Sequence, residues 1–306
     1  MMKEKIFVAR RLTKKYKKSY ALNGLDMEIC RGSIYGFVGK NGAGKTTLMR
    51  ILTGRAVQTD GEIGLFGEKQ QSKMYIQRKR VGAMVEGPAF YPGMTAKDNL
   101  EVVRLQKGIE DKGCIKEILE IVGLEDTGTK KARNFSLGMK QRLGIAIALM
   151  GKPELLVLDE PVNGLDPEGI ASLRELLKKL NQEQGMTILV SSHILSELDQ
   201  LATCYGFINK GKMIEQVTTE ELFKKCEPYL NMRVNDVQKA AHVLRKMFPG
   251  NRLEIVTDKQ LCLYNFSGNT ADVMKECLLN EVDIKEIRAE GASLEKYYME
   301  LMKKVK

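Results

Sequence analysis

The first 216 residues alternate short apolar runs with helix-like patterns, which is typical of an α/β unit with helices packed on a sheet. The runs that predict strands are 6–9, 21–30, 34–38, 62–66, 81–86, 155–158, 187–192 and 203–209. A helical pattern over 168–184 begins after Pro167 and ends at Gly185. Residues 96–151 are almost wholly helical in pattern, so we expect an inserted helical subdomain at about 87–151.

The pattern starts again after about residue 216. Strand-like and helix-like segments then follow in the order βαββαβ, which is the split ferredoxin-like arrangement. The segments are 229–234, 236–248, 252–257, 261–266, 270–281 and 282–289, with a hairpin turn at Asp258 and Lys259. An amphipathic helix over 293–306 is expected to pack its apolar face on the chain, or else to dock in a partner groove. The predicted architecture is an α/β domain over 1–216 and a smaller α+β ferredoxin-like domain over 217–306.

A glycine-rich segment lies between the strand predicted at 34–38 and a helical pattern. It reads Gly39, Lys40, Asn41, Gly42, Ala43, Gly44, Lys45, Thr46 and Thr47. Its glycines let backbone N–H groups converge on a polyphosphate, and the positive end of the following helix adds to the attraction. The Lys45 ammonium group suits the β- and γ-phosphates, and the Thr46 hydroxyl suits Mg²⁺. The segment therefore predicts a site for MgATP or MgGTP.

Two carboxylates, Asp159 and Glu160, follow the apolar run at 155–158. Because side chains alternate along a strand, the two carboxylates are expected to point to different places. Asp159 is then able to hold Mg²⁺ through water, while Glu160 faces the attacking water as a general base. The alternative is a pair of carboxylates that only ends the strand.

Charge and composition narrow the classes of partner. The net charge is +10, but residues 1–20 carry eight basic residues against one Glu, whereas residues 217–306 carry fifteen basic against fourteen acidic residues. A local excess of this kind fits an anionic ligand or a solvated loop, so no nucleic-acid partner is expected. No apolar run is long enough to cross a bilayer and the first residues lack a signal region, which predicts a cytoplasmic chain. Six scattered cysteines without a Cys-x-x-Cys pair predict neither a zinc site nor a disulfide framework.

Further motifs follow in one order along the chain. Tyr16 lies in the basic N-terminal segment, residues 136–142 read Ser-Leu-Gly-Met-Lys-Gln-Arg, residues 163–166 read Asn-Gly-Leu-Asp, and His193 follows the strand predicted at 187–192. Taken singly, the Tyr is an ordinary surface residue and the His a structural one. Together with the glycine-rich segment and the two carboxylates, these motifs resemble the nucleotide-binding subunit of ATP-binding cassette (ABC) transporters, over residues 1 to about 216.

This resemblance implies an ATPase with ATP and Mg²⁺ as cofactors, in which Tyr16 stacks on adenine and His193 contacts the γ-phosphate. It also implies that Ser136, Gly138 and Asp166 meet the nucleotide of a second cassette, so that two copies sandwich two ATP molecules as a homodimer. The N-terminus of a helix predicted at 138–150 suits such a contact. A separate integral-membrane permease is the further partner implied, with this chain peripheral on the inner face of the cell membrane.

Two features depart from the family pattern. Glu86 stands where most members carry a Gln, and Leu137 and Met139 replace a Gly and a Gln of the signature segment. Glu86 remains able to reach Mg²⁺ or an attacking water as an ionised acceptor. With the Gly-Pro that follows, it resembles the exporter ATPases of bacitracin resistance and lantibiotic self-protection, which implies export of a peptide antibiotic or similar amphipathic compound. The alternatives are a methionine-type importer ATPase and a soluble ABC ATPase acting on ribosomes or DNA.

Overall fold

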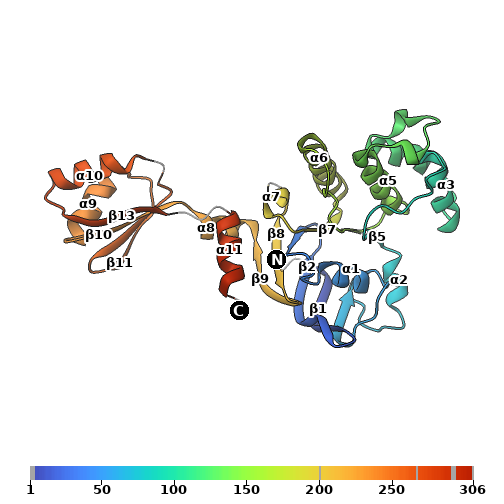
Figure 1. Cartoon of the computed structure of the whole chain (residues 1–306), viewed down its shortest axis with the longest axis horizontal. Helices are drawn as coiled ribbons and strands as arrows, with labels where there is room; N and C mark the ends of the chain where they lie inside the picture. Colours follow the sequence, from blue (N-terminus) through green and yellow to red (C-terminus); the bar gives the residue numbers. More distant parts are fainter. Residues whose placement is uncertain (1–3, 200, 267, 291–293, 305–306) are drawn as a thin grey trace. The chain divides into compact units, whose positions relative to one another are not determined.

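Figure 1 shows a computed structural model of the chain, which describes residues 4–199, 201–266, 268–290 and 294–304. The chain divides into two compact units, one that ends at Thr219 and one that runs from Glu220 to Lys304. Each unit contains a hydrophobic cluster of its own, as separate domains do.

The first unit is built on a six-stranded sheet in which five strands are parallel and the last is antiparallel. In pairing order the strands are β5 (Val81–Met84), β6 (Leu155–Leu158), β7 (Thr187–Ser192), β3 (Ile34–Val38), β8 (Cys204–Asn209) and β9 (Lys212–Thr218). Every residue of β3, β6 and β7 is buried, as expected of parallel strands covered on both faces. The carboxyl ends of these three strands consequently meet at one edge of the sheet.

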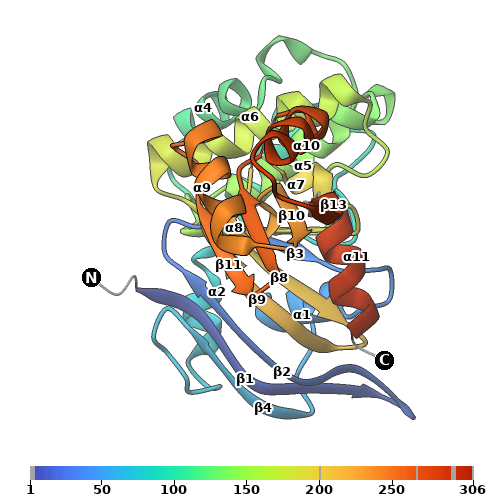
Figure 2. The ribbon, with the colours of Figure 1, turned by 90° about the vertical axis from the view of Figure 1, so that its left-hand side faces the viewer.

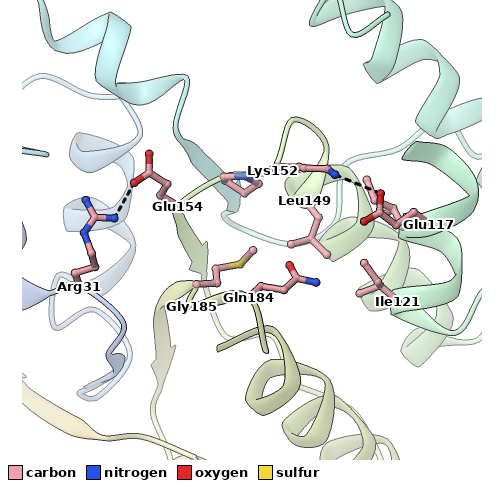
Figure 3. Close-up of a pocket in the computed structure, with 11 residues that line it drawn as sticks. Arg31, Glu117, Ile121, Leu149, Lys152, Glu154, Gln184 and Gly185 are labelled. Atoms are coloured by element: carbon pink, nitrogen blue, oxygen red, sulfur yellow. Dashed lines mark hydrogen bonds and ion pairs between the residues drawn. The ribbon is translucent and has the colours of Figure 1, made fainter. Parts of the chain in front are cut away.

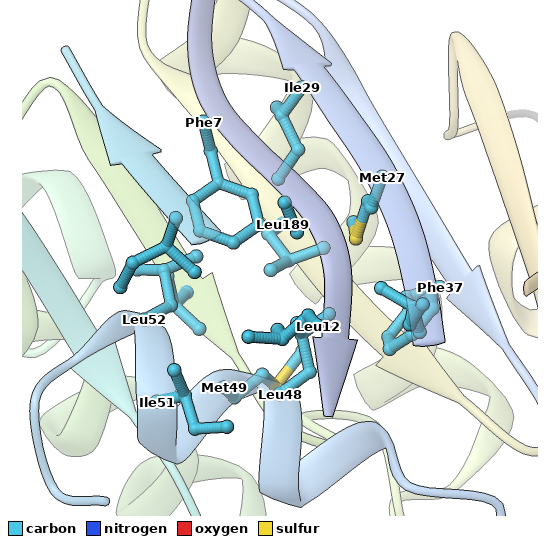
Figure 4. Close-up of a cluster of buried hydrophobic side chains, with 14 of the residues drawn as sticks. Phe7, Leu12, Met27, Ile29, Phe37, Leu48, Met49, Ile51, Leu52 and Leu189 are labelled. Atoms are coloured by element: carbon cyan, nitrogen blue, oxygen red, sulfur yellow. The ribbon is translucent and has the colours of Figure 1, made fainter. Parts of the chain in front are cut away.

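A three-stranded antiparallel sheet completes the β-structure of this unit, with β1 (Lys5–Tyr16) between β2 (Ser19–Cys30) and β4 (Asp60–Leu65). Its apolar side chains join those of the six-stranded sheet and of helix α1 (Lys45–Leu52) in one core cluster. Figure 4 shows Leu12 of β1 beside Leu48 and Met49 of α1. The helix that follows the glycine-rich segment is thus fixed between the two sheets.

Other helices of the first unit lie on and beside the six-stranded sheet. They are α2 (Met74–Arg78), α3 (Ala96–Gln106), α4 (Gly113–Val122), α5 (Leu137–Leu149), α6 (Pro167–Gln184), α7 (Leu195–Leu198) and the 3₁₀ turns η1 (Glu125–Thr127) and η2 (Ala132–Asn134). Helices α3, α4 and α5 contact one another and form the helical subdomain, and α5 also contacts β5. Thr95 begins α3 with a capping box that includes Asp98, which satisfies two backbone N–H groups at that end of the helix.

The second unit has a four-stranded antiparallel sheet in the order β11-β12-β10-β13. Its elements are α8 (Thr219–Cys226), β10 (Tyr229–Val234), α9 (Val237–Met247), β11 (Leu253–Thr257), β12 (Gln260–Tyr264), α10 (Thr270–Leu279), β13 (Ile284–Glu290) and α11 (Leu294–Lys304). Figures 1 and 2 show α9 and α10 side by side on one side of this sheet. From β10 to β13 the order is βαββαβ, so the ferredoxin-like prediction is confirmed.

Some predicted bounds were wrong. Strand β1 extends to Tyr16, well beyond the predicted 6–9, because an antiparallel strand with one solvated face accommodates its arginines and lysines. Strand β5 ends at Met84, before Glu86. No strand was predicted at β9, and no helix at α2, α7 or α8. Of the helix predicted over 293–306, both ends lie outside the described residues.

Among the described residues, no helix combines the length and the apolar character needed to span a membrane.

Candidate functional site

The glycine-rich segment connects the carboxyl end of β3 to the start of α1. Gly42 and Gly44 have φ values of 78° and 114°, which side chains with a Cβ rarely adopt. A Cβ on Gly44 would lie 2.4 Å from the Ala21 carbonyl oxygen, and one on Gly39 would lie 2.6 Å from the Ile208 carbonyl oxygen. The tight turn therefore requires glycine at these positions.

A small cavity of about 180 Å³ adjoins this turn. It is lined by Ala21, Asn41, Gly42, Ala43, Gly44, Lys45, Thr46, Thr47 and Glu160. Residues 41–47 of the predicted phosphate loop thus border one space, and the Gly39 carbonyl accepts a hydrogen bond from Lys45. Backbone N–H groups at the start of α1 give this space a positive potential.

Lys45 is the charged residue most enclosed by the turn, since it is only 5% exposed. Its ammonium group donates hydrogen bonds to the Gly39 carbonyl and, at 3.3 Å, to the Lys40 carbonyl. The Nζ atom also lies 3.1 Å from Oε1 of Glu160. A buried cation thus stands beside the cavity with one carboxylate as its counter-ion.

Asp159 connects the end of β6 to the turn. Its carboxylate is 6% exposed and accepts hydrogen bonds from the Thr46 hydroxyl at 2.8 Å and from the Ser191 hydroxyl at 2.7 Å. Within the described ranges, no three acidic, His or Cys side chains gather as a metal site. One carboxylate and one hydroxyl nevertheless fit Mg²⁺, which keeps several waters and takes its other ligands from substrate phosphates.

Glu160 lies between Lys45 and the predicted histidine. It has a left-handed φ of 50°, and its N–H donates to the Ser191 hydroxyl at 2.9 Å. One carboxylate oxygen lies 2.7 Å from Nδ1 of His193, while the other is buried and has no hydrogen bond apart from its ion contact with Lys45. An unusual backbone conformation at a site residue is typical of functional positions. The structure therefore brings Asp159, Glu160 and His193 together beside the phosphate loop.

Glu86 contacts a residue of α1 in the structure. It follows the end of β5, is exposed, and forms an ion pair with Arg50 of α1. Its side chain contacts Arg50 rather than Thr46 or Asp159, so its proposed metal and catalytic roles stay predictions.

The residues predicted to meet a second copy are surface residues that stand apart from the cavity. Ser136 begins α5 and accepts a hydrogen bond from the Met139 N–H at 3.3 Å, with the partly exposed Gly138 in the first turn. Asp166 begins α6 and accepts from the Gly169 N–H at 3.0 Å. Each side chain thus caps a helix while remaining exposed, an arrangement open to a partner.

Tyr16 is also a surface residue. It is the last residue of β1 and is 41% exposed, and the Lys14 ammonium group lies 4.9 Å from the centroid of its ring. The ring is not part of the cavity lining. An exposed aromatic face beside a cation is suited to stacking on a base that carries phosphates.

Sequence reasoning missed Ser191 and Arg50. Ser191 is fully buried near the end of β7, where it contacts Asp159 and Glu160, the two residues that follow β6. Its place just before Ser192 and His193 at the end of an apolar run was an available signal. Arg50 offered no signal in the sequence, because only the fold brings it to Glu86.

A larger cavity, of about 460 Å³, lies at the opposite edge of the six-stranded sheet, where β6 and β7 begin. Figure 3 shows the charged groups of its lining joined in pairs, Arg31 with Glu154 at 2.7 Å and Lys152 with Glu117 at 3.4 Å. Hydrogen bonds from Arg80 and Arg31 lower the pKa of Glu154 to about 2, against the opposing effect of partial burial. The volume of a cavity therefore does not identify the functional site, because the charged groups that line this larger cavity form ion pairs with one another.

The parallel sheet, the glycine turn at the end of β3 and the acidic pair at the end of β6 define a P-loop nucleoside triphosphatase. A model of the ABC transporter family matches residues 22–163. The chain belongs to this family as an ATP-binding, ATP-hydrolysing subunit.

Known proteins resemble most of the chain. It is 41% identical to the bacitracin transport ATP-binding protein BcrA of Bacillus licheniformis, over 95% of each chain. It is 46% identical to the lantibiotic transport ATP-binding protein SrtF of Streptococcus pyogenes, over 66% of this chain and 86% of that protein. A dimeric post-hydrolysis structure of the ATP-binding cassette MJ0796, bound to ADP and Pi, matches with a TM-score of 0.63 and 26% identity, over 69% of this chain and 98% of that one.

Proposed function

We propose that this chain binds MgATP at the phosphate loop, pairs with a second copy, and drives a separate membrane permease that exports a peptide antibiotic or similar amphipathic compound. The observation that supports the chemistry most directly is the meeting of Thr46 and Asp159 at 2.8 Å, beside Lys45 and Glu160. The direction of transport and the class of compound are supported by similarity to BcrA over nearly the full chain and to SrtF over the cassette.

The phosphate loop and Lys45 bind the triphosphate in this proposal. Lys45 is positioned to exchange its contact with Glu160 for the β- and γ-phosphates. Because a phosphate is also a strong acceptor for N–H groups, the turn at Gly42 and Gly44 and the start of α1 contribute in the same place. Tyr16 is proposed to carry the adenine base.

Thr46 and Asp159 are the residues that would hold Mg²⁺. When bound, the ion neutralises charge on the phosphate oxygens during transfer to water. Ser191 supports this arrangement because its hydroxyl fixes the second oxygen of Asp159. Glu86 is proposed as a further acceptor for the metal or the attacking water.

Glu160 is proposed as the general base. Its carboxylate lies at the cavity with one oxygen towards His193 and the other towards Lys45. Departure of Lys45 to the phosphates would leave that oxygen free to accept a proton from water, while His193 keeps the carboxylate oriented and reports the γ-phosphate. In this way the contacts between Glu160, His193 and Lys45 serve both the hydrolysis of ATP and the sensing of its γ-phosphate.

A second copy is proposed to supply Ser136, Gly138 and Asp166 to the nucleotide held by the first. These residues are at least partly exposed at the beginnings of α5 and α6, two helix ends with free N–H groups. The dimeric MJ0796 structure supports pairing of related cassettes. The permease would then hold the pair at the inner face of the cell membrane as a peripheral, cytoplasmic unit.

The test has two arms. Purified Glu160→Gln should bind MgATP as well as wild type but lose hydrolysis by at least ~10²-fold, the usual scale for a positioned base. In cells that also express the candidate permease, wild type should raise bacitracin resistance and Glu160→Gln should not. Hydrolysis by Glu160→Gln within a few-fold of wild type contradicts the proposed base; unchanged resistance with an active ATPase contradicts the proposed export.

A further inference from the structure

Arg50 forms an ion pair with Glu86 at the edge of the ATP site. Arg50 lies on α1, five positions after Lys45, and its guanidinium contacts the Glu86 carboxylate directly. The two side chains are 35% and 51% exposed. The helix that begins at the phosphate loop is thereby connected to the residue that departs from the family pattern.

Tyr16 also affects the same guanidinium. The hydrogen bond to Glu86 raises the pKa of Arg50 against the opposing effect of partial burial, and Tyr16 adds a smaller rise. Arg50 therefore interacts with both Tyr16, which is proposed to stack on adenine, and Glu86, which is proposed to serve the metal.

The backbone at Glu86 is also held from α1 and its following loop. Glu86 and Gly87 have successive left-handed φ values of 69° and 110°, which is a strained arrangement for the glutamate. The Arg55 guanidinium donates to the Val85 carbonyl at 3.4 Å, one residue before the ion pair. Two arginines therefore contact the connection between β5 and the helical subdomain.

The ion pair between Arg50 and Glu86 depends on the negative charge of Glu86. A glutamine amide is neutral, whereas an ionised carboxylate attracts both a guanidinium and a divalent cation. Arg50 contacts one of the two carboxylate oxygens, Oε1, and its positive charge repels a second cation at the same carboxylate. Arg50 therefore opposes the binding of Mg²⁺ by Glu86.

We propose that Arg50 is a positioning residue that holds the Glu86 carboxylate back from the metal and releases it when MgATP binds. This inference rests on the proposed function, in particular on Glu86 as an acceptor for the metal or its water. A contact that has to be given up on binding lowers the apparent affinity for the ligand. Removing Arg50 should consequently tighten MgATP binding.

The experiment measures binding of a non-hydrolysable imido analogue of ATP by calorimetry, with Mg²⁺ and again with EDTA. With Mg²⁺, Arg50→Gln should bind roughly two- to fivefold more tightly than wild type, the scale of an exposed ion pair. In EDTA the gain should vanish, because Glu86 then has no metal to reach. In a Glu86→Gln background, Arg50→Gln should add no gain, since the ion pair is already absent.

Arg10→Gln is the matched control, because it removes another exposed arginine–glutamate pair, that of Arg10 with Glu28 on neighbouring strands. It should leave analogue binding unchanged. Weaker or equal binding by Arg50→Gln with Mg²⁺ overturns the inference and makes Arg50 a plain nucleotide contact or a surface residue. Failure of wild type to bind the analogue at all contradicts the proposed function instead.

Discussion

Charged groups lie at both edges of the six-stranded sheet, but their burial and their pairing differ between the two edges. At the carboxyl ends of β3, β6 and β7, Lys45 and Asp159 are buried, and one oxygen of Glu160 has only its ion contact with Lys45. At the amino ends, Glu154 is half-exposed and paired with two arginines, around a cavity of larger volume.

The difference shows what distinguishes a reactive site from a structural one in this fold. Paired, solvated charges such as Arg31 with Glu154 have little to gain from a ligand. The buried Lys45 and the partly buried Glu160 have lost much of their hydration, so they are suited to interact with a triphosphate. The smaller cavity is accordingly the better candidate for chemistry.

Lys45→Ala should have the largest effect on nucleotide binding. It removes the charge that neutralises the β- and γ-phosphates in both the ground state and the transition state, so affinity and turnover should fall together by at least ~10²-fold. Calorimetry with MgATP and a phosphate-release assay measure the two quantities. Unchanged affinity would mean that the charged, buried edge is not where the triphosphate binds.

Glu86→Ala should have an intermediate effect, concentrated in coupling to the membrane partner. Because Glu86 precedes the helical subdomain at a strained joint, its loss should reduce permease-stimulated turnover several-fold more than basal turnover, whereas Glu86→Gln should be milder. The measurement compares ATPase rates with and without the reconstituted permease. Equal loss in both conditions would make Glu86 an ordinary active-site residue.

Glu154→Gln should have the smallest effect and should act on stability alone. The folded-state pKa of Glu154 lies below its unfolded value of about 4.5, so its contribution is present above pH 4.5 and is lost as the pH falls toward about 2. For a half-exposed group the loss at about pH 7 should be ~1 kcal/mol or less. Denaturant melts across this pH range should show the wild-type advantage shrinking below about pH 4.5.

Sequence alone predicted the parts of the structure that depend on local pattern. Strands β3, β6 and β7 have the predicted bounds because they are continuous apolar runs between turn signals. Strand β9 was missed because it is an edge strand with mixed polarity. The boundary predicted near residue 216 falls within β9, whereas the two units divide after Thr219, and its value as a cutting point stays a prediction.

In the candidate site, too, the residues that belong to local sequence motifs were predictable. Residues 39–47 and the pair Asp159 and Glu160 carry their chemistry in short motifs, so spacing was sufficient to find them. Ser191 and Arg50 act through contacts between segments far apart in the chain. No local pattern encodes such contacts, and the fold was needed to reveal them.

The most direct test compares the ATP turnover of two variants, Glu160→Gln and Glu154→Gln, one at each edge of the sheet. Glu154 precedes β6 and Glu160 lies two residues beyond its end, so the same substitution is made at both edges of one sheet. Turnover should fall by at least ~10²-fold in Glu160→Gln and stay within about twofold of wild type in Glu154→Gln. Similar turnover in the two variants, or a larger loss in Glu154→Gln, would contradict the assignment of ATP hydrolysis to the phosphate-loop edge.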